Sequence, residues 1–227
     1  MTLLLTLDHL QIIKNQAESS YPNECCGLLL GQRQGDRKTV SHVWATDNAW
    51  DANAATWLAQ LDPPLAQDCN SKNNGKGNSK GDRYWIDPSE MLAAQRYGRH
   101  HHCEIIGIYH SHPDHSAIPS ECDRRLAWSV YSYLIVSVQQ GIVQDLLSWS
   151  LDDCNQFQPE PLLIDAATFP ETVKPAVKPV VLPAPPSTRL HAADLGNAYP
   201  GTVHPVMADP GTAHPDTANR WDQSRQR

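Results

Sequence analysis

Residues 104–123 read Glu-Ile-Ile-Gly-Ile-Tyr-His-Ser-His-Pro-Asp-His-Ser-Ala-Ile-Pro-Ser-Glu-Cys-Asp. The apolar run over 104–110 predicts a central buried strand. Pro119 and Ser120 then predict the start of a helix that runs through Leu126 and Trp128, because serine is a favoured N-cap residue. The stretch therefore predicts a strand, a loop and a helix in immediate succession.

Apolar spacing predicts the other elements of a mixed fold. Helical spacing runs over 7–20, and Pro22 ends that helix. Pro88 fits the first turn of a second helix, which runs to about His100. Strands are expected at 24–31, 39–45, 84–87, 133–138 and 144–151. Helices and strands alternate irregularly, so the fold class is α/β.

Two segments lack the apolar pattern of a core. Residues 51–83 are a low-complexity insertion, and its part from 71 to 82 has no apolar side chain, so we expect a disordered loop there. Of the 18 prolines, 12 lie within 159–215. The sequence thus predicts one domain over 1–160 and a Pro-rich, disordered tail over 161–227.

Charge and composition argue against several classes of protein. The 227 residues carry a formal net charge of −7, whereas nucleic-acid binders usually present a basic face. No run approaches the roughly 18 apolar residues of a membrane span, and we identify no signal peptide. The six cysteines are expected to be reduced and mostly buried, which favours a cytoplasmic location.

The stretch quoted first also carries a set of potential metal ligands. His110 and His112 are two residues apart at the end of a strand, so both rings can point to the same side. Asp123 lies in the first turn of the following helix. Two histidines and one carboxylate form a catalytic zinc set, which leaves a fourth position for water. Glu24, at the beginning of the first buried strand, is the candidate general base.

These residues resemble the JAMM signature of MPN-domain metallopeptidases. The signature is a Glu, then His-x-His, seven residues, and Ser-x-x-Asp; here it is Glu24, His110, His112, Ser120 and Asp123. The resemblance covers roughly 5–155 and is closest to the stand-alone bacterial type. It implies a single MPN domain, with a mixed sheet flanked by helices and a cytidine-deaminase-like shape.

The resemblance also implies roles. His110, His112 and Asp123 bind Zn2+. Glu24 takes a proton from the water and later gives it to the leaving amine, while Ser120 helps hold the water or the oxyanion. The implied partner is a peptide or a ubiquitin-like sulfur-carrier protein, cut after its C-terminal Gly-Gly to release cysteine or a C-terminal extension. Neither nucleic acid nor membrane is an expected partner, and a homodimer is left open.

Several alternatives stay open. The protein could be a peptidase on short peptides, a non-catalytic MPN scaffold, or a RadC-like protein. The RadC motif normally continues with Ser-Gly, whereas Asp114 and His115 follow here, as substrate contacts or as a solvated loop. The run at 99–102 fits a basic helix end better than a metal site. Cys26 is the one thiol that could approach the site, and Cys122 is expected in the core.

Overall fold

A computed structural model describes residues 1–61 and 79–165 of the chain. The predicted loop over 71–82 lies for the most part outside the described residues. The same is true of the predicted tail over 161–227. No helix of the described residues is long and apolar enough to cross a membrane.

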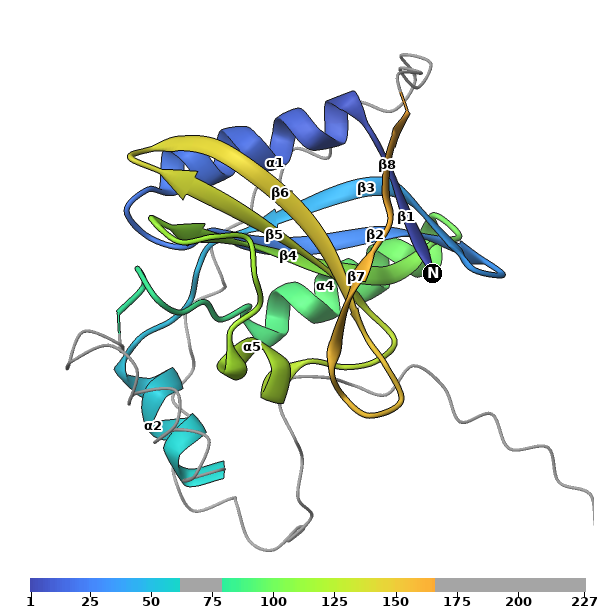
Figure 1. The fold of residues 1–227 in the computed structure, drawn as a ribbon. Coiled ribbons are helices and arrows are strands. Elements are labelled where there is room, and N and C mark those ends of the chain that lie inside the picture. The colour runs from blue at the N-terminus through green and yellow to red at the C-terminus, as the bar shows by residue number, and fades with distance from the viewer. Residues whose placement is uncertain (62–78, 166–227) are drawn as a thin grey trace, which may run out of the picture. The chain divides into compact units, whose positions relative to one another are not determined.

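Among the described residues, eight strands form one sheet in the order β7-β6-β5-β4-β2-β3-β1-β8 (Figure 1). The strands are β1 (Thr2–Thr6), β2 (Cys26–Gln34), β3 (Arg37–Thr46), β4 (Glu104–Pro113), β5 (Ser132–Gln139), β6 (Ile142–Leu151), β7 (Phe157–Glu160) and β8 (Leu162–Asp165). The helices are α1 (Leu7–Ser20), α2 (Ala52–Leu61), α4 (Pro88–His100) and α5 (Glu121–Leu126).

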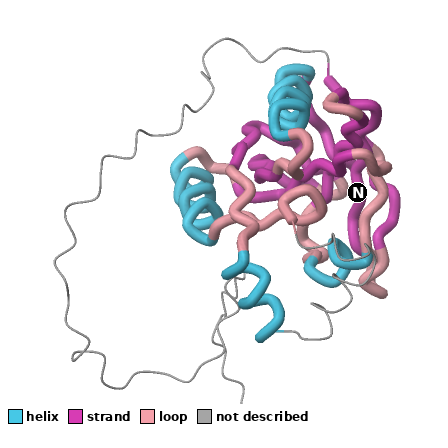
Figure 2. Tube along the Cα trace, turned by 90° about the vertical axis from the view of Figure 1, so that its left-hand side faces the viewer, coloured by secondary structure: helices cyan, strands magenta, loops and turns pink. Residues whose placement is uncertain are grey.

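Strand β4 lies in the middle of the sheet, antiparallel to β2 and parallel to β5. Helices α1 and α4 lie on opposite faces of this sheet, and the turned view also shows helices outside the strands (Figures 1 and 2). Tyr109 points towards α1, where its hydroxyl donates to Gln16 Oε1. His110 and His112 project to the opposite face of β4 from their odd-numbered neighbours Tyr109 and Ser111, because side chains alternate along a strand.

The core beneath α1 is apolar. Ile13 and Ala17 of the helix are buried, as the helical spacing predicts, and both belong to one cluster with strand side chains. The strand members include Leu29 of β2, Tyr109 of β4 and Val136 of β5. Burial of this apolar area is the main term that holds α1 on the sheet.

The two edges of the sheet approach each other. β7 lies at one edge and β8 at the other, yet only Pro161 separates them along the chain. Lys38 of β3 is fully buried, and its Nζ donates to Ser132 Oγ of β5 at 3.0 Å, although β2 and β4 lie between these strands. A contact across two strands requires a strongly curved sheet.

Most predicted elements are confirmed, including the helix over 7–20 and the central strand. The predicted strand at 84–87 is wrong: this segment joins no strand, and Trp85 instead bonds to Asn48 Oδ1 and Ala49 N. Sequence analysis missed β1, α2, β7 and β8. Strand β8 pairs with β1 and lies in the segment predicted as tail. Strand β7, which precedes β8 along the chain, contains Pro159, and an edge strand tolerates proline.

Candidate metal centre

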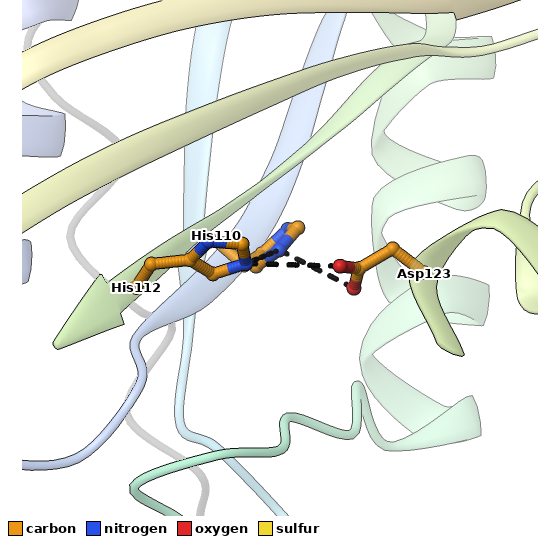
Figure 3. Close-up of side chains that lie close together, drawn as sticks. All are labelled: His110, His112 and Asp123. Atoms are coloured by element: carbon orange, nitrogen blue, oxygen red, sulfur yellow. Dashed lines mark hydrogen bonds and ion pairs between the residues drawn. The ribbon is translucent and has the colours of Figure 1, made fainter. Parts of the chain in front are cut away.

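Three side chains that can bind a metal converge at the end of β4 (Figure 3). His110 Nε2 and His112 Nε2 are 3.0 Å apart. Asp123 reaches them from α5, with Oδ1 3.4 Å from His110 Nε2 and Oδ2 3.7 Å from His112 Nε2. Within residues 1–61 and 79–165, no other group of three histidine, cysteine or acidic residues converges in this way.

The spacing of these donors fits a tetrahedral zinc ion. Nitrogen and oxygen ligands about 2.0–2.1 Å from zinc are separated by roughly 3.3 Å when they are tetrahedral. The two nitrogens are 3.0 Å apart, and their nearest carboxylate oxygens, which are different oxygens of Asp123, are 3.4 and 3.7 Å away, all close to that value. Three protein ligands leave one tetrahedral position open, as in catalytic zinc sites.

Hydrogen bonding and burial leave both imidazoles able to bind a cation. His112 Nδ1 lies 2.8 Å from the Ser116 carbonyl oxygen, which can only accept, so Nδ1 carries a proton and Nε2 is the nitrogen that faces the other two side chains. His110 is fully buried, and burial lowers its pKa to about 4. It is therefore neutral at pH 7. Tyr84 stacks on its ring, with the centroids 4.5 Å apart.

The start of α5 orients the carboxylate. Ser120 is the N-cap, and its Oγ accepts from Asp123 N at 3.1 Å. In return, Asp123 Oδ2 accepts from Ser120 N at 2.7 Å, which completes a capping box. Burial opposes ionisation of Asp123, but His110 and His112 hold its pKa below the usual range. The carboxylate is therefore ionised and fixed at the position where it meets the histidines.

Glu24 lies beside these three potential ligands. It precedes β2, in which Cys26 pairs with His110, while the backbone of Cys25 bonds to both N and Oγ of Ser111. Continuing this antiparallel register brings Glu24 level with His112. Glu24 is 7% exposed, and burial together with Asp123 raises the pKa of its carboxyl well above the usual range. A raised pKa suits a carboxyl that gains and loses a proton near neutral pH.

The family of this chain follows from a match to a known protein domain. The family described as prokaryotic homologs of the JAB domain matches residues 6–152. The chain belongs to this family. The match extends over β2, β4 and α5, and so includes all five residues of the signature. The expected α/β fold of the MPN type is thereby confirmed.

Individual relatives resemble this chain to different extents. Desampylase from Haloferax volcanii is 38% identical over 117 residues, which are 51% of this chain and 63% of that protein's length. A solved protein from Desulfitobacterium hafniense is 26% identical with a TM-score of 0.52, and the match covers 73% of this chain and 94% of the other. A JAB1/MPN domain protein from Archaeoglobus fulgidus is 16% identical with a TM-score of 0.37, and the match covers 72% and 99%.

One wall of the JAB site is made by residues that sequence analysis missed. Asn48 Nδ2 donates to Glu24 O at 3.0 Å and to Arg83 O at 2.8 Å. Its Oδ1 accepts from Trp50 N at 2.9 Å and from Trp85 N at 3.2 Å. All four bonds that this amide can make are used. No pattern in the sequence marks Asn48, because two of its partners are 24 and 35 residues away.

The remaining candidates lie outside the metal centre. Cys26 is fully buried, and burial raises the pKa of its thiol to about 12, so it is no nucleophile at pH 7. Cys122 is buried against Trp50 and Leu58, as expected for a core residue. Cys122 is disulfide-bonded, however, so the expectation of reduced thiols is wrong for it. The expectation of reduced thiols is confirmed for the free cysteines Cys25, Cys26, Cys103 and Cys154.

Asp114, in the loop after His112, and the basic run at 99–102 make contacts that hold the fold together. Asp114 accepts from Tyr21 Oη at 2.9 Å and from Gln140 N at 3.0 Å, and so ties the end of α1 to the turn after β5. Its backbone has a φ of 55°, which aspartate tolerates better than most residues. In the basic run, α4 ends at His100, and His101 stacks on Tyr97.

Proposed function

We propose that the protein is a zinc-dependent peptidase that hydrolyses an amide bond at the centre formed by His110, His112 and Asp123. The observation that carries the proposal is the convergence of two imidazoles and one carboxylate, with donor atoms within 4.8 Å of one another, beside a buried carboxyl. The three donors would hold the ion, and Glu24 would be the acid and base. A zinc ion bound there supplies Lewis-acid activation of water and of the scissile carbonyl.

The chain's own residues supply the proton transfers. Glu24 accepts a proton from the attacking water and donates it to the amine that leaves. Burial favours the neutral carboxyl, so this residue can hold the proton between the two steps. The Ser120 hydroxyl already accepts from Asp123 N, but its own proton can still be donated to the water or to a developing oxyanion.

The proposed substrate is a ubiquitin-like sulfur-carrier protein, cut after its C-terminal Gly-Gly to release cysteine or a short extension. The name of the Haloferax relative, a desampylase, supports an isopeptidase that acts on a ubiquitin-like modifier. An extended C-terminal tail is also the form of chain that can lie along a strand edge. A cytoplasmic location belongs to the same proposal.

Zinc content tests the metal centre directly. Purified wild-type protein should contain about one zinc per chain, and Glu24→Gln should keep it. His112→Ala should lose most of it, because two ligands bind zinc far more weakly than three. His101→Ala is the matched control, since His101 lies at the end of α4 and outside the centre.

Cleavage tests the activity. A carrier protein extended after Gly-Gly should lose the mass of the extension with wild-type enzyme, and Glu24→Gln should slow this by about 10²–10⁴-fold. Cleavage of short peptides but not of the carrier would favour the peptidase on short peptides. Absence of zinc from the wild type, with no uptake on addition, would overturn the proposal in favour of a non-catalytic scaffold.

A further inference from the structure

The segment from Arg83 to Trp85 is held against the metal centre at several points. Asn48 bonds to the backbone of both Arg83 and Trp85, as described above. Tyr84 stacks on the ligand His110 with an interplanar angle of 22°. Three residues before this segment, Lys80 O accepts a hydrogen bond from Glu24 N at 2.7 Å. The segment is thus a fixed wall of the site.

Arg83 is the cation in this wall, and its bonding capacity is largely unused. Its Nη1 donates to the Asp82 carbonyl at 2.5 Å, but its Nε is buried and has no hydrogen-bond partner. Within the described part of the chain, no carboxylate forms an ion pair with Arg83. A buried N–H without a partner is costly, and such groups are rare in folded proteins.

The position of Arg83 relative to Glu24 indicates which ligand it receives. Asn48 Nδ2 donates to the carbonyl oxygens of both residues, so their backbones lie side by side. The positive charge of Arg83 acts on the Glu24 carboxyl without a direct ion pair, and partly offsets the effect of burial on its pKa. The guanidinium therefore lies near the proton donor and is not neutralised by it.

We infer that Arg83 binds the α-carboxylate of the residue released by the reaction, so that the preferred substrate ends one residue after the scissile bond. The inference rests on the proposed function, in which Glu24 gives its proton to the leaving amine. In a released amino acid, the carboxylate carbon is two bonds from that amine, within about 2.5 Å. A cation beside Glu24 is placed to meet it.

The Arg83 guanidinium and an α-carboxylate are complementary in charge and in hydrogen-bonding geometry. A guanidinium offers a planar fork of N–H donors to the two oxygens of a carboxylate. A lysine joined by an isopeptide bond would place its own backbone carboxyl carbon at the far end of a four-carbon side chain, out of reach of the same guanidinium. The site should therefore discriminate between a C-terminal extension of one residue and an isopeptide bond.

Three substrates of the zinc-loaded enzyme test the inference. Each is the same ubiquitin-like carrier ending in Gly-Gly, followed by a C-terminal cysteine with a free carboxylate, by cysteine amide, or by an isopeptide-linked lysine peptide. In the wild type, kcat/KM should be about tenfold to a hundredfold higher for the free carboxylate than for the amide, the range expected for a charge-assisted pair. Arg83→Gln should abolish this preference, so that kcat/KM becomes the same for the free carboxylate and for the amide.

Two further variants and a binding assay separate recognition from folding. Arg83→Lys should recover part of the preference, because it keeps the charge without the fork. Arg99→Gln, in an exposed part of α4, should behave as wild type. In a Glu24→Gln background, the dissociation constant for a Gly-Gly-Cys peptide should be lower with a free carboxylate than with an amide, and Arg83→Gln should remove that difference.

Equal cleavage of carboxylate and amide by the wild type would overturn the inference while leaving the peptidase intact. An Arg83→Gln variant that loses activity on all substrates in the same proportion would also overturn it, since that result indicates a structural role. If the wild type cuts none of the three, the proposed function fails, and the binding assay then decides on Arg83 alone.

Discussion

Replacing Lys38 with methionine should change how the stability of the domain depends on pH. Lys38 is fully buried, and burial lowers the pKa of its ammonium group from 10.5 to about 8, although the charge of Glu160 opposes this. Between pH 8 and 10.5 the unfolded chain therefore binds a proton that the folded chain does not. In this window stability rises with pH, because deprotonation removes the cost of the buried charge.

The size of the effect follows from the two pKa values. One pKa unit corresponds to about 1.4 kcal/mol, so lowering the pKa from 10.5 to about 8 costs about 3 kcal/mol of stability below pH 8. The cost fades as pH rises and is absent above 10.5. Between pH 7.5 and 9.5, the wild type should gain about 2 kcal/mol relative to a chain without Lys38.

Urea unfolding followed by tryptophan fluorescence at pH 7.5, 8.5 and 9.5 measures this gain. Burial also raises the pKa of Cys25 to about 11 and that of Cys26 to about 12, which makes stability fall with pH above about 9. Both proteins contain these thiols, so subtracting the unfolding free energy of Lys38→Met from that of the wild type cancels the contribution of the thiols to the pH dependence.

Lys14→Met on α1 serves as the control for loss of a lysine. A difference between wild type and Lys38→Met that stays constant within about 0.5 kcal/mol across the three pH values would refute the reasoning. It would mean that the ammonium of Lys38 is solvated in the folded protein.

Three other substitutions test local features of the structure. Asn48→Asp turns an oxygen towards two carbonyl groups that now receive N–H donors. It should lower the unfolding free energy in urea by about 2–4 kcal/mol. A change below about 1 kcal/mol would contradict the four hydrogen bonds assigned to the Asn48 side chain. Gly31→Ala places a Cβ 2.0 Å from Thr39 O and should lower the unfolding free energy by more than about 2 kcal/mol. Gly81→Ala, whose Cβ would lie 3.3 Å from its nearest neighbour, should change the unfolding free energy little. Equal effects of the two substitutions would be inconsistent with the packing. Ser120→Ala should cost about 1 kcal/mol through loss of the N-cap but keep zinc, because Ser120 N still donates to Asp123; loss of zinc would show that the hydroxyl is needed to hold the ligand.

The elements that carry the three potential ligands could be predicted from the sequence because their determinants are local. The strand ending in His110 and His112 is an apolar run, and the helix carrying Asp123 begins with a capping box whose two members are three residues apart. The strands β1, β7 and β8 were missed because they are short, with four or five residues each. Helix α2 is rich in alanine and leucine, which favour a helix, and it was missed because its residues were grouped with the polar segment 71–82 of the same insertion.

The sequence by itself determined the local framework: the helix over 7–20, the central strand, and a loop and a helix that turn two imidazoles and a carboxylate in compatible directions. Tertiary structure alone decided what surrounds them. Cys26 pairs with His110 across 84 residues of chain, which brings Glu24 to the site, and Asn48 ties Arg83 beside it. The buried contact of Lys38 with Ser132 likewise depends on the curvature of the whole sheet. Such long-range pairings follow from register and packing, which no short stretch of sequence specifies.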